Sequence, residues 1–92
     1  MYKKETVIKN ATGLHARPAA EFIKAAKMFQ SKLTIQRTDG SVAKSTNAKS
    51  MVTLLTLALA CGERIEIGGD GPDEVEAVDA LVALVDSGFG EV

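Results

Sequence analysis

The sequence predicts an α+β fold, a two-layer open-faced sandwich in which helices cover one face of a sheet and the other face meets solvent. Segments that alternate apolar and polar residues, as half-buried strands do, are interspersed with segments whose apolar residues recur at helical spacing. These segments follow one another in the order β-α-β-β-α-β-α. Because 92 residues suffice for one domain and not for two, we expect a single domain over residues 1–92.

Four segments have the composition or the alternation of strands: residues 2–9, 32–38, 41–46 and 63–68. In the second, Leu33 and Ile35 fall on one face, and in the last Ile65 and Ile67 do the same. The Asp-Gly pair at 39–40 is a strong hairpin signal, and it predicts that the strand near 41–46 returns beside the strand at 32–38.

The first helix is expected over residues 17–29, where Pro18 suits the first turn because its missing N–H is not needed there. Its apolar residues recur at helical spacing: Ala19, Phe22, Ile23, Ala26 and Phe29. Lys24 and Lys27 fall on another side of this helix. The sequence therefore predicts an amphipathic helix with one buried stripe.

Two further helices are expected. One runs over residues 51–60, between the N-cap candidate Ser50 and Gly62, with Leu54 and Leu57 in the core. The other lies within residues 71–89; it opens with Pro72 and acidic residues, which suit the helix dipole, and ends at Gly88. Its apolar stripe is predicted from helical spacing: Val75, Val78, Leu81, Val82 and Val85.

Composition and charge exclude several classes of function. The formal net charge is −1, which argues against general binding of nucleic acid. The single cysteine, Cys61, allows no internal disulfide, and no apolar run resembles a signal peptide or a membrane span, so we expect a cytoplasmic protein with no membrane insertion. One histidine and one cysteine are too few ligands for a typical metal site, and no cofactor is expected.

The segment ATGLHARPAA at residues 11–20 holds the only histidine, His15, just before the expected helix start near Arg17 or Pro18. Free backbone N–H groups and the helix dipole make that position favourable for an anion, and Arg17 adds a full positive charge. Positive surroundings lower the pKa of His15 and leave a neutral, nucleophilic imidazole, which suits phosphoryl transfer to nitrogen. From the residues alone, a solvated surface histidine without function remains the alternative.

The segment GLHARPAAEFIKAAKMF resembles the active-site motif of the HPr family, the histidine-containing phosphocarriers of the bacterial phosphoenolpyruvate:sugar phosphotransferase system (PTS). NAKSMVTLLTLALACG resembles the second signature of that family, and IEIGGDGPDEVEAVDALVALV resembles its last strand and helix. The resemblance spans essentially the whole chain. It implies the HPr-like fold, with an antiparallel sheet in the order 1-4-2-3 and three helices on one face.

The resemblance also implies a role for each matching residue. His15 would accept a phosphoryl group on Nδ1 from phosphorylated enzyme I and pass it to the IIA domain of a sugar permease. Arg17 would neutralise charge, the backbone N–H groups of Ala16 and Arg17 would bind phosphate oxygens, and Pro18 would set the helix start. The protein would thus be a covalent relay between enzymes rather than an enzyme with a turnover of its own.

Ser50 is the second site that the resemblance implies. In Gram-positive relatives the matching serine is phosphorylated by HPr kinase/phosphorylase, and the product binds a catabolite-control transcription factor. A serine that caps the following helix is the structural alternative, and one hydroxyl can serve both purposes.

The resemblance further implies a docking surface for these partners. It combines part of the first helix with the helix after Ser50: Ala20, Lys24, Lys27, Met51, Val52 and Leu55. A solvated face for the lysines and a core position for the apolar residues are the alternatives.

Three departures from the family pattern leave alternatives open, and one of them is Glu21, an acidic residue on the helix that is expected to face partners. The hairpin at residues 37–49 is about four residues longer than in many HPr proteins, which changes the surface before Ser50. The C-terminal segments also resemble NPr, the nitrogen-branch paralogue, which has the same histidine chemistry and other partners. A regulatory module that acts mainly through Ser50 is a further alternative. We expect a monomer, although long hairpins can exchange between copies.

Overall fold

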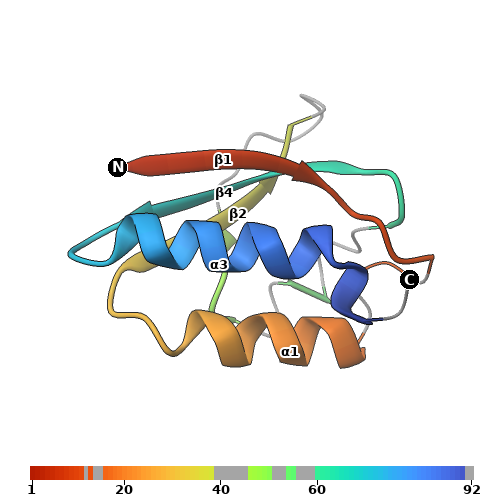
Figure 1. Cartoon of the computed structure of the whole chain (residues 1–92), viewed down its shortest axis with the longest axis horizontal. Coiled ribbons are helices and arrows are strands. Elements are labelled where there is room, and N and C mark those ends of the chain that lie inside the picture. Colours follow the sequence, from red (N-terminus) through yellow and green to blue (C-terminus); the bar gives the residue numbers. More distant parts are fainter. Residues whose placement is uncertain (12, 14–15, 39–45, 51–53, 56–59, 91–92) are drawn as a thin grey trace.

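Two helices lie on one face of an antiparallel sheet in the computed structural model, which describes residues 1–11, 13, 16–38, 46–50, 54–55 and 60–90 (Figure 1). The elements follow the chain in this order: β1 (Tyr2–Val7), α1 (Ala16–Ala26), β2 (Lys32–Arg37), β3 (Thr46–Asn47), β4 (Arg64–Asp70), α3 (Glu74–Asp86) and the 3₁₀ turn η1 (Gly88–Gly90).

The strands lie in the order β1-β4-β2-β3, which is the order that the resemblance implies. β4 pairs antiparallel with β1 on one side and with β2 on the other, so that Ile67 lies between Lys4 and Ile35. The described part of the expected returning strand near 41–46 is only Thr46 and the next residue; most of that segment, with the Asp-Gly turn, lies outside the described residues. Among the described residues, the sheet therefore consists of three long strands and the two residues of β3.

Both described helices are shorter than expected. α1 begins at Ala16, one residue before the expected start, and ends at Ala26 rather than 29, because Met28 and Phe29 donate backbone hydrogen bonds only three residues back and close the last turn. α3 begins at Glu74, so Pro72 lies before it rather than inside it. Of the third expected helix, over residues 51–60, only Leu54, Leu55 and Ala60 fall among the described residues, and the first two are helical.

The core lies between the sheet and the helices, where the predicted alternation places it. Leu33, Ile35, Ile65 and Ile67 all point inward and are almost completely buried. The predicted stripe of α1 is buried as well, except that Phe29 is only half-buried, and Leu54 is buried as expected. Leu57, the other residue expected there, lies outside the described residues.

The predicted stripe of α3 is wrong at Val75, which is 50% exposed. At this end of the helix it is Glu74 that lies over the sheet: a Cβ built on Gly69 would lie 3.3 Å from the Cβ of Glu74. A helical residue turns about 100° from its predecessor, so Val75 faces solvent. Val78 resumes the buried stripe one turn later.

Two aspartates of α3 fasten this helix to β1. Asp79 accepts hydrogen bonds from the Tyr2 hydroxyl at 2.9 Å and pairs with Lys4 at 3.0 Å. The hydrogen bond from Lys4 comes first among the contacts that lower the pKa of Asp79. Two turns later Asp86 accepts a hydrogen bond from Thr6, which lowers the pKa of Asp86. These contacts hold the edge strand β1 against α3.

Candidate functional site

A turn over residues 10–13 brings the chain from β1 to the start of α1. The buried side-chain amide of Asn10 donates to the Gly13 carbonyl at 2.7 Å, and the Gly13 N–H donates back to the Asn10 carbonyl at 3.0 Å. Gly13 has a φ of 67°, a conformation that glycine adopts at little cost. Asn and Gly are both frequent in turns, and here the Asn10 side chain itself closes the turn.

The N-terminus of α1 is open to solvent and carries uncompensated positive charge. Ala16 and Arg17 are exposed, and Pro18, which has no N–H to leave unsatisfied, is buried in the first turn. The first turn contains no acidic residue. Free N–H groups and the helix dipole therefore act there together with the Arg17 guanidinium. His15, the residue directly before this helix, lies outside the described residues. The lowered pKa expected for its imidazole therefore stays a prediction.

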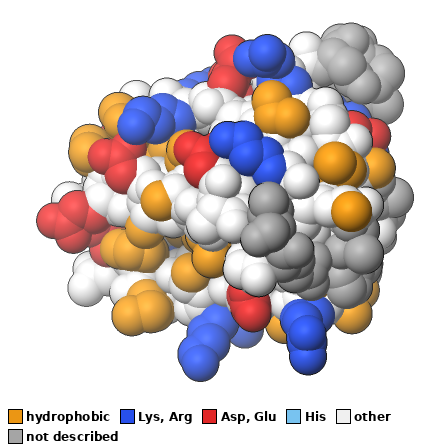
Figure 2. Space-filling model, turned by 45° about the vertical axis from the view of Figure 1, so that its right-hand side comes forward, with side chains coloured by type: hydrophobic (Ala, Val, Ile, Leu, Met, Phe, Trp, Pro, Cys, Tyr) orange, Lys and Arg blue, Asp and Glu red, His pale blue; other side chains and the backbone are white. Residues whose placement is uncertain are grey.

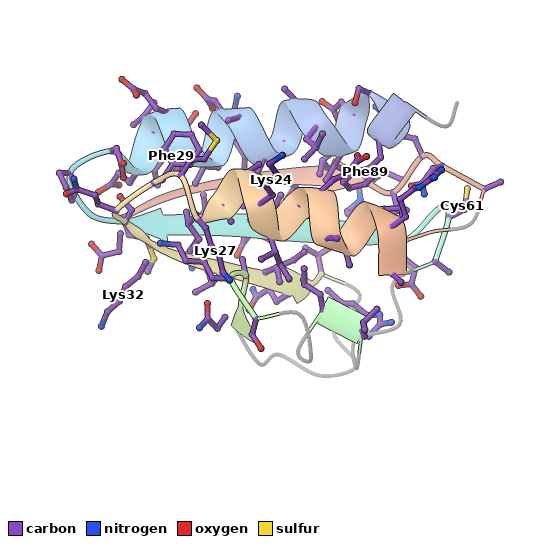
Figure 3. All side chains as sticks on the ribbon, turned by 90° about the horizontal axis from the view of Figure 1, so that it is seen from below. Lys24, Lys27, Phe29, Lys32, Cys61 and Phe89 are labelled. Atoms are coloured by element: carbon purple, nitrogen blue, oxygen red, sulfur yellow. The ribbon has the colours of Figure 1, made fainter. Side chains whose placement is uncertain are left out.

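One exposed stripe runs along α1 from this end. Arg17, Ala20, Lys24 and Lys27 are all exposed and follow one another at spacings of three and four residues, which places them on one face. Figure 3 shows Lys24 and Lys27 projecting from the helix into solvent. The four residues thus form a continuous surface that begins next to His15, and we refer to them as the α1 stripe.

The cations of the described chain divide into two groups. Lys3, Lys4, Lys9, Arg37 and Arg64 each pair with a carboxylate within 4.0 Å, on the side of β1 and β4 or at the end of β2. Among the described residues, the cations of the α1 stripe form no ion pair, and neither do Lys32 and Lys49. In Figure 2, basic and acidic side chains lie side by side on the upper part of the face, and at the lower edge, formed by α1, basic side chains project on either side of one acidic side chain. The positive charge of α1 is available to a partner.

Ser50 stands where a helix N-cap would stand. Its backbone carbonyl accepts a hydrogen bond from the Leu54 N–H at 3.1 Å, which is the first i to i+4 bond expected of a helix that starts after residue 50. Ser50 is half-buried, and Leu55 is 44% exposed, in keeping with its predicted place on a docking surface. Met51 and Val52 lie outside the described residues.

The described residues contain neither a cluster of metal ligands nor a membrane-spanning helix. No group of three or more His, Cys, Asp or Glu side chains in this part of the chain is arranged to hold a metal ion. No helix within the described ranges is long and apolar enough to cross a membrane.

The chain matches known proteins over almost its whole length. The family model described as "PTS HPr component phosphorylation site" matches residues 2–87. The phosphocarrier protein HPr of Haemophilus influenzae is 49% identical over 85 residues, which cover 92% of this chain and 95% of that protein. The phosphocarrier protein NPr of Klebsiella oxytoca is 40% identical over 92 residues, with 99% of each chain covered.

Solved structures match as well. The HPr of Thermoanaerobacter tengcongensis superimposes with a TM-score of 0.90 at 40% identity, covering 100% of this chain and 99% of that one. A structure of the HPr dimer from the same organism gives a TM-score of 0.74 at 41% identity, with 99% and 100% covered.

Proposed function

Because this chain belongs to the HPr family and is a phosphocarrier of the PTS, we propose that His15 is the residue that carries the phosphoryl group. The observation that carries this assignment is the open N-terminus of α1, which begins at the residue after His15 and has no acidic side chain in its first turn. An anion held there meets free N–H groups, a favourable dipole and the Arg17 guanidinium.

The chemistry is a direct displacement at phosphorus. A neutral imidazole nitrogen of His15, assigned as Nδ1, attacks the phosphoryl group as its bond to the donor breaks, so that one P–N bond replaces another bond to phosphorus. The phosphoryl oxygens carry more negative charge than the imidazole did before transfer. The N–H groups of Ala16 and Arg17 and the Arg17 side chain stabilise that charge.

Enzyme I is the donor and a IIA domain the acceptor in this proposal, and both dock on the α1 stripe. Its cations are exposed and form no ion pair within the described chain, so acidic partner surfaces gain contacts without breaking internal ones. Met51, Val52 and Leu55 complete the docking surface on the third helix of the fold, which we place over residues 51–60. We further propose that residues 1–92 form one domain, which acts as a monomer.

Acid lability of the bound phosphate tests the site. The chain, His15→Ala and Ser50→Ala are each incubated with enzyme I and labelled phosphoenolpyruvate. We expect acid-labile label on the parent and on Ser50→Ala, and none on His15→Ala. His15→Ala should keep the far-UV circular dichroism of the parent, since the next residue, Ala16, is exposed at the start of α1. Acid-labile label on His15→Ala would overturn the assignment.

The identity of the acceptor distinguishes the sugar branch from the nitrogen branch. The nitrogen branch is an alternative because the chain is also similar to NPr. We propose the sugar branch, because the HPr of H. influenzae is the more similar of the two relatives and the segment NAKSM around Ser50 resembles HPr. The phosphorylated chain is offered in parallel to a sugar-specific IIA domain and to a nitrogen-branch IIA domain. Faster transfer to the sugar-specific domain is expected, and the reverse order would assign the chain to the nitrogen branch.

A further inference from the structure

A groove of about 370 Å³ lies beyond the C-terminal end of α1, at the other end of the helix from His15. It is lined by residues 30–34, which run from the loop after α1 into β2, by Asn47 in β3 and by Lys49 just after β3. α1 has 11 residues and is therefore about 16 Å long, so the groove is separate from the proposed phosphorylation site.

The described lining of this groove includes two lysines, Lys32 and Lys49, and no acidic residue. Neither Lys32 nor Lys49 forms an ion pair within the described part of the chain. Asp70 lies opposite Lys32 in the β2–β4 register and is exposed, yet the two do not pair. Asp73 is the other acidic neighbour, and its carboxylate accepts hydrogen bonds from Gln30 and Ser31. The groove is thus a positively charged hollow without an internal counter-ion.

Lys49 is held in place by the backbone around it. Its ammonium group donates to the Phe29 carbonyl at 2.8 Å, which uses one of its three N–H bonds and leaves two. The side-chain oxygen of Asn47 accepts a hydrogen bond from the Lys49 N–H at 2.9 Å, so the amide N–H groups of Asn47 remain as donors. Lys49 is half-buried, whereas Lys32 is exposed at the rim. The donors are therefore partly ordered before any ligand arrives.

We propose that this groove binds a small phosphorylated metabolite, with the phosphoryl group between Lys32 and Lys49. Two cations and neutral amide donors match a dianion with several acceptor oxygens better than they match a single carboxylate. The volume lies at the lower end of the range for small-molecule sites, about 300–1,000 Å³, and leaves room for the carbon skeleton. The buried Leu33 supplies an apolar part of the lining.

Amide chemical shifts measured by NMR test the proposal on the intact chain. Glucose 6-phosphate, inorganic phosphate and acetate are titrated separately at constant ionic strength, set with sodium chloride. We expect saturable shifts at residues 30–34 and 47–49 with glucose 6-phosphate, at least threefold weaker binding of inorganic phosphate, and none of acetate. Equal affinities for the two phosphates, or equal binding of acetate, would overturn the assignment to a phosphorylated metabolite.

Matched lysine pairs identify the residues responsible. Lys32→Gln with Lys49→Gln is expected to weaken binding of glucose 6-phosphate at least fivefold, and Lys24→Gln with Lys27→Gln, which removes the same charge from α1, less than twofold. Lys32→Gln alone keeps the Lys49 contact with Phe29 and should still weaken binding at least twofold. Equal losses in the two double variants would overturn the site. Shifts confined to residues 16–18 would also overturn it, while leaving the role of His15 untouched.

Discussion

Asp73 is the residue that joins the start of α3 to the loop after α1. Its carboxylate accepts the backbone N–H groups of Gln30 at 2.9 Å and Ser31 at 3.0 Å, and it also accepts the Ser31 hydroxyl. Ser31 is 1% exposed and donates its only hydroxyl proton here. These bonds lower the pKa of Asp73, the one from the Ser31 hydroxyl most of all. Residues 42 positions apart in the chain are thus fixed together.

The pH dependence of stability should reveal this carboxylate. Because its pKa is lower in the folded chain than the ordinary value of 3.8, the stability that it contributes is present above that value and is lost as the pH falls through the folded pKa. Asp73→Asn should therefore be less stable than the parent at pH 7, and the difference should shrink below pH of about 4. Urea unfolding at a series of pH values measures both.

Glu76→Gln is the matched control for this experiment, since Glu76 is an exposed acid on the same helix. It removes a charge from the first turn of α3 without breaking a hydrogen bond to another segment, so it should cost less than about 1 kcal/mol. If the difference in the free energy of unfolding between Asp73→Asn and the parent persisted unchanged at low pH, the shape of the Asp73 side chain, rather than its charge, would account for the stabilisation.

At the scale of elements, the adjacent glycines of β4 set the distance to the helical layer. A Cβ on Gly69 would lie 2.9 Å from Val78 Cγ2 and 3.3 Å from the Glu74 carbonyl oxygen, which are parts of α3. A Cβ on Gly68 would instead lie 2.8 Å from Thr34 Oγ1, on the opposite face of the sheet. Only the Cβ on Gly69 would meet the backbone of a packed helix, at the Glu74 carbonyl oxygen.

The two alanine variants should therefore differ. Gly69→Ala forces α3 away from the sheet and is expected to cost about 1–3 kcal/mol. Gly68→Ala requires only a rotation of Thr34, and the lower entropy of its unfolded chain offsets that cost, so it should stay within about 1 kcal/mol of the parent. Denaturant unfolding measures both, and equal losses would mean that the layer spacing is not set at Gly69.

The helix after Ser50 carries a prediction of its own. If the hydroxyl caps that helix, Ser50→Ala loses about 1 kcal/mol of stability and still accepts phosphate at a near-normal rate. Ser50→Asp adds a negative charge that a helix N-terminus tolerates, so it should fold well. The same charge beside the apolar docking residues should slow transfer to His15. Thermal melts and rates of phosphorylation by enzyme I measure the two effects, and equal rates for Ser50→Asp and the parent would leave Ser50 as a cap alone.

The elements that sequence reasoning predicted well are those that local periodicity determines. Leu33, Ile35, Ile65 and Ile67 follow the alternation of a half-buried strand and are buried. Val75 has the correct spacing for the buried stripe of α3 and is nevertheless exposed, because Glu74 occupies the space over Gly69. The spacing of apolar residues along one helix does not predict which of them will pack against the sheet, because that depends on the shape of the sheet surface.

For the molecule as a whole, the separation of paired and unpaired cations is the feature that bears on partner binding. Replacing Lys24 and Lys27 by Gln should slow phosphoryl transfer from enzyme I severalfold at low salt and less at high salt, because screening weakens the attraction that both lysines provide. Lys3→Gln with Lys9→Gln is the control. It changes the net charge equally, at lysines that are already paired with Glu66 and Asp86. Equal slowing in both variants would show that net charge, and not the α1 stripe, governs the encounter.

The separation of charges could not be read from the sequence. Lys24 and Lys27 were predicted to lie off the apolar stripe of their helix, and both are exposed. Which cations find a carboxylate depends on contacts between distant segments, such as Lys4 with Asp79 and Arg37 with Glu63. The groove beside Lys49 was missed for the same reason, since its walls come from two separate parts of the chain.

The position of β4 in the sheet has a consequence for synthesis. It is the last strand that the ribosome makes, yet both long ladders, with β1 and with β2, require it. Until Arg64–Asp70 has emerged, β2–β3 is the one pairing that a nascent chain can form among the described strands, and the apolar side chains of α1 lack the long ladders that they cover. Pairings between such distant segments form slowly, because the entropy cost of closing a long loop comes before the stabilising hydrogen bonds can form. The domain should therefore fold after most of its chain has been released, with exposed apolar surface that a chaperone can bind until then.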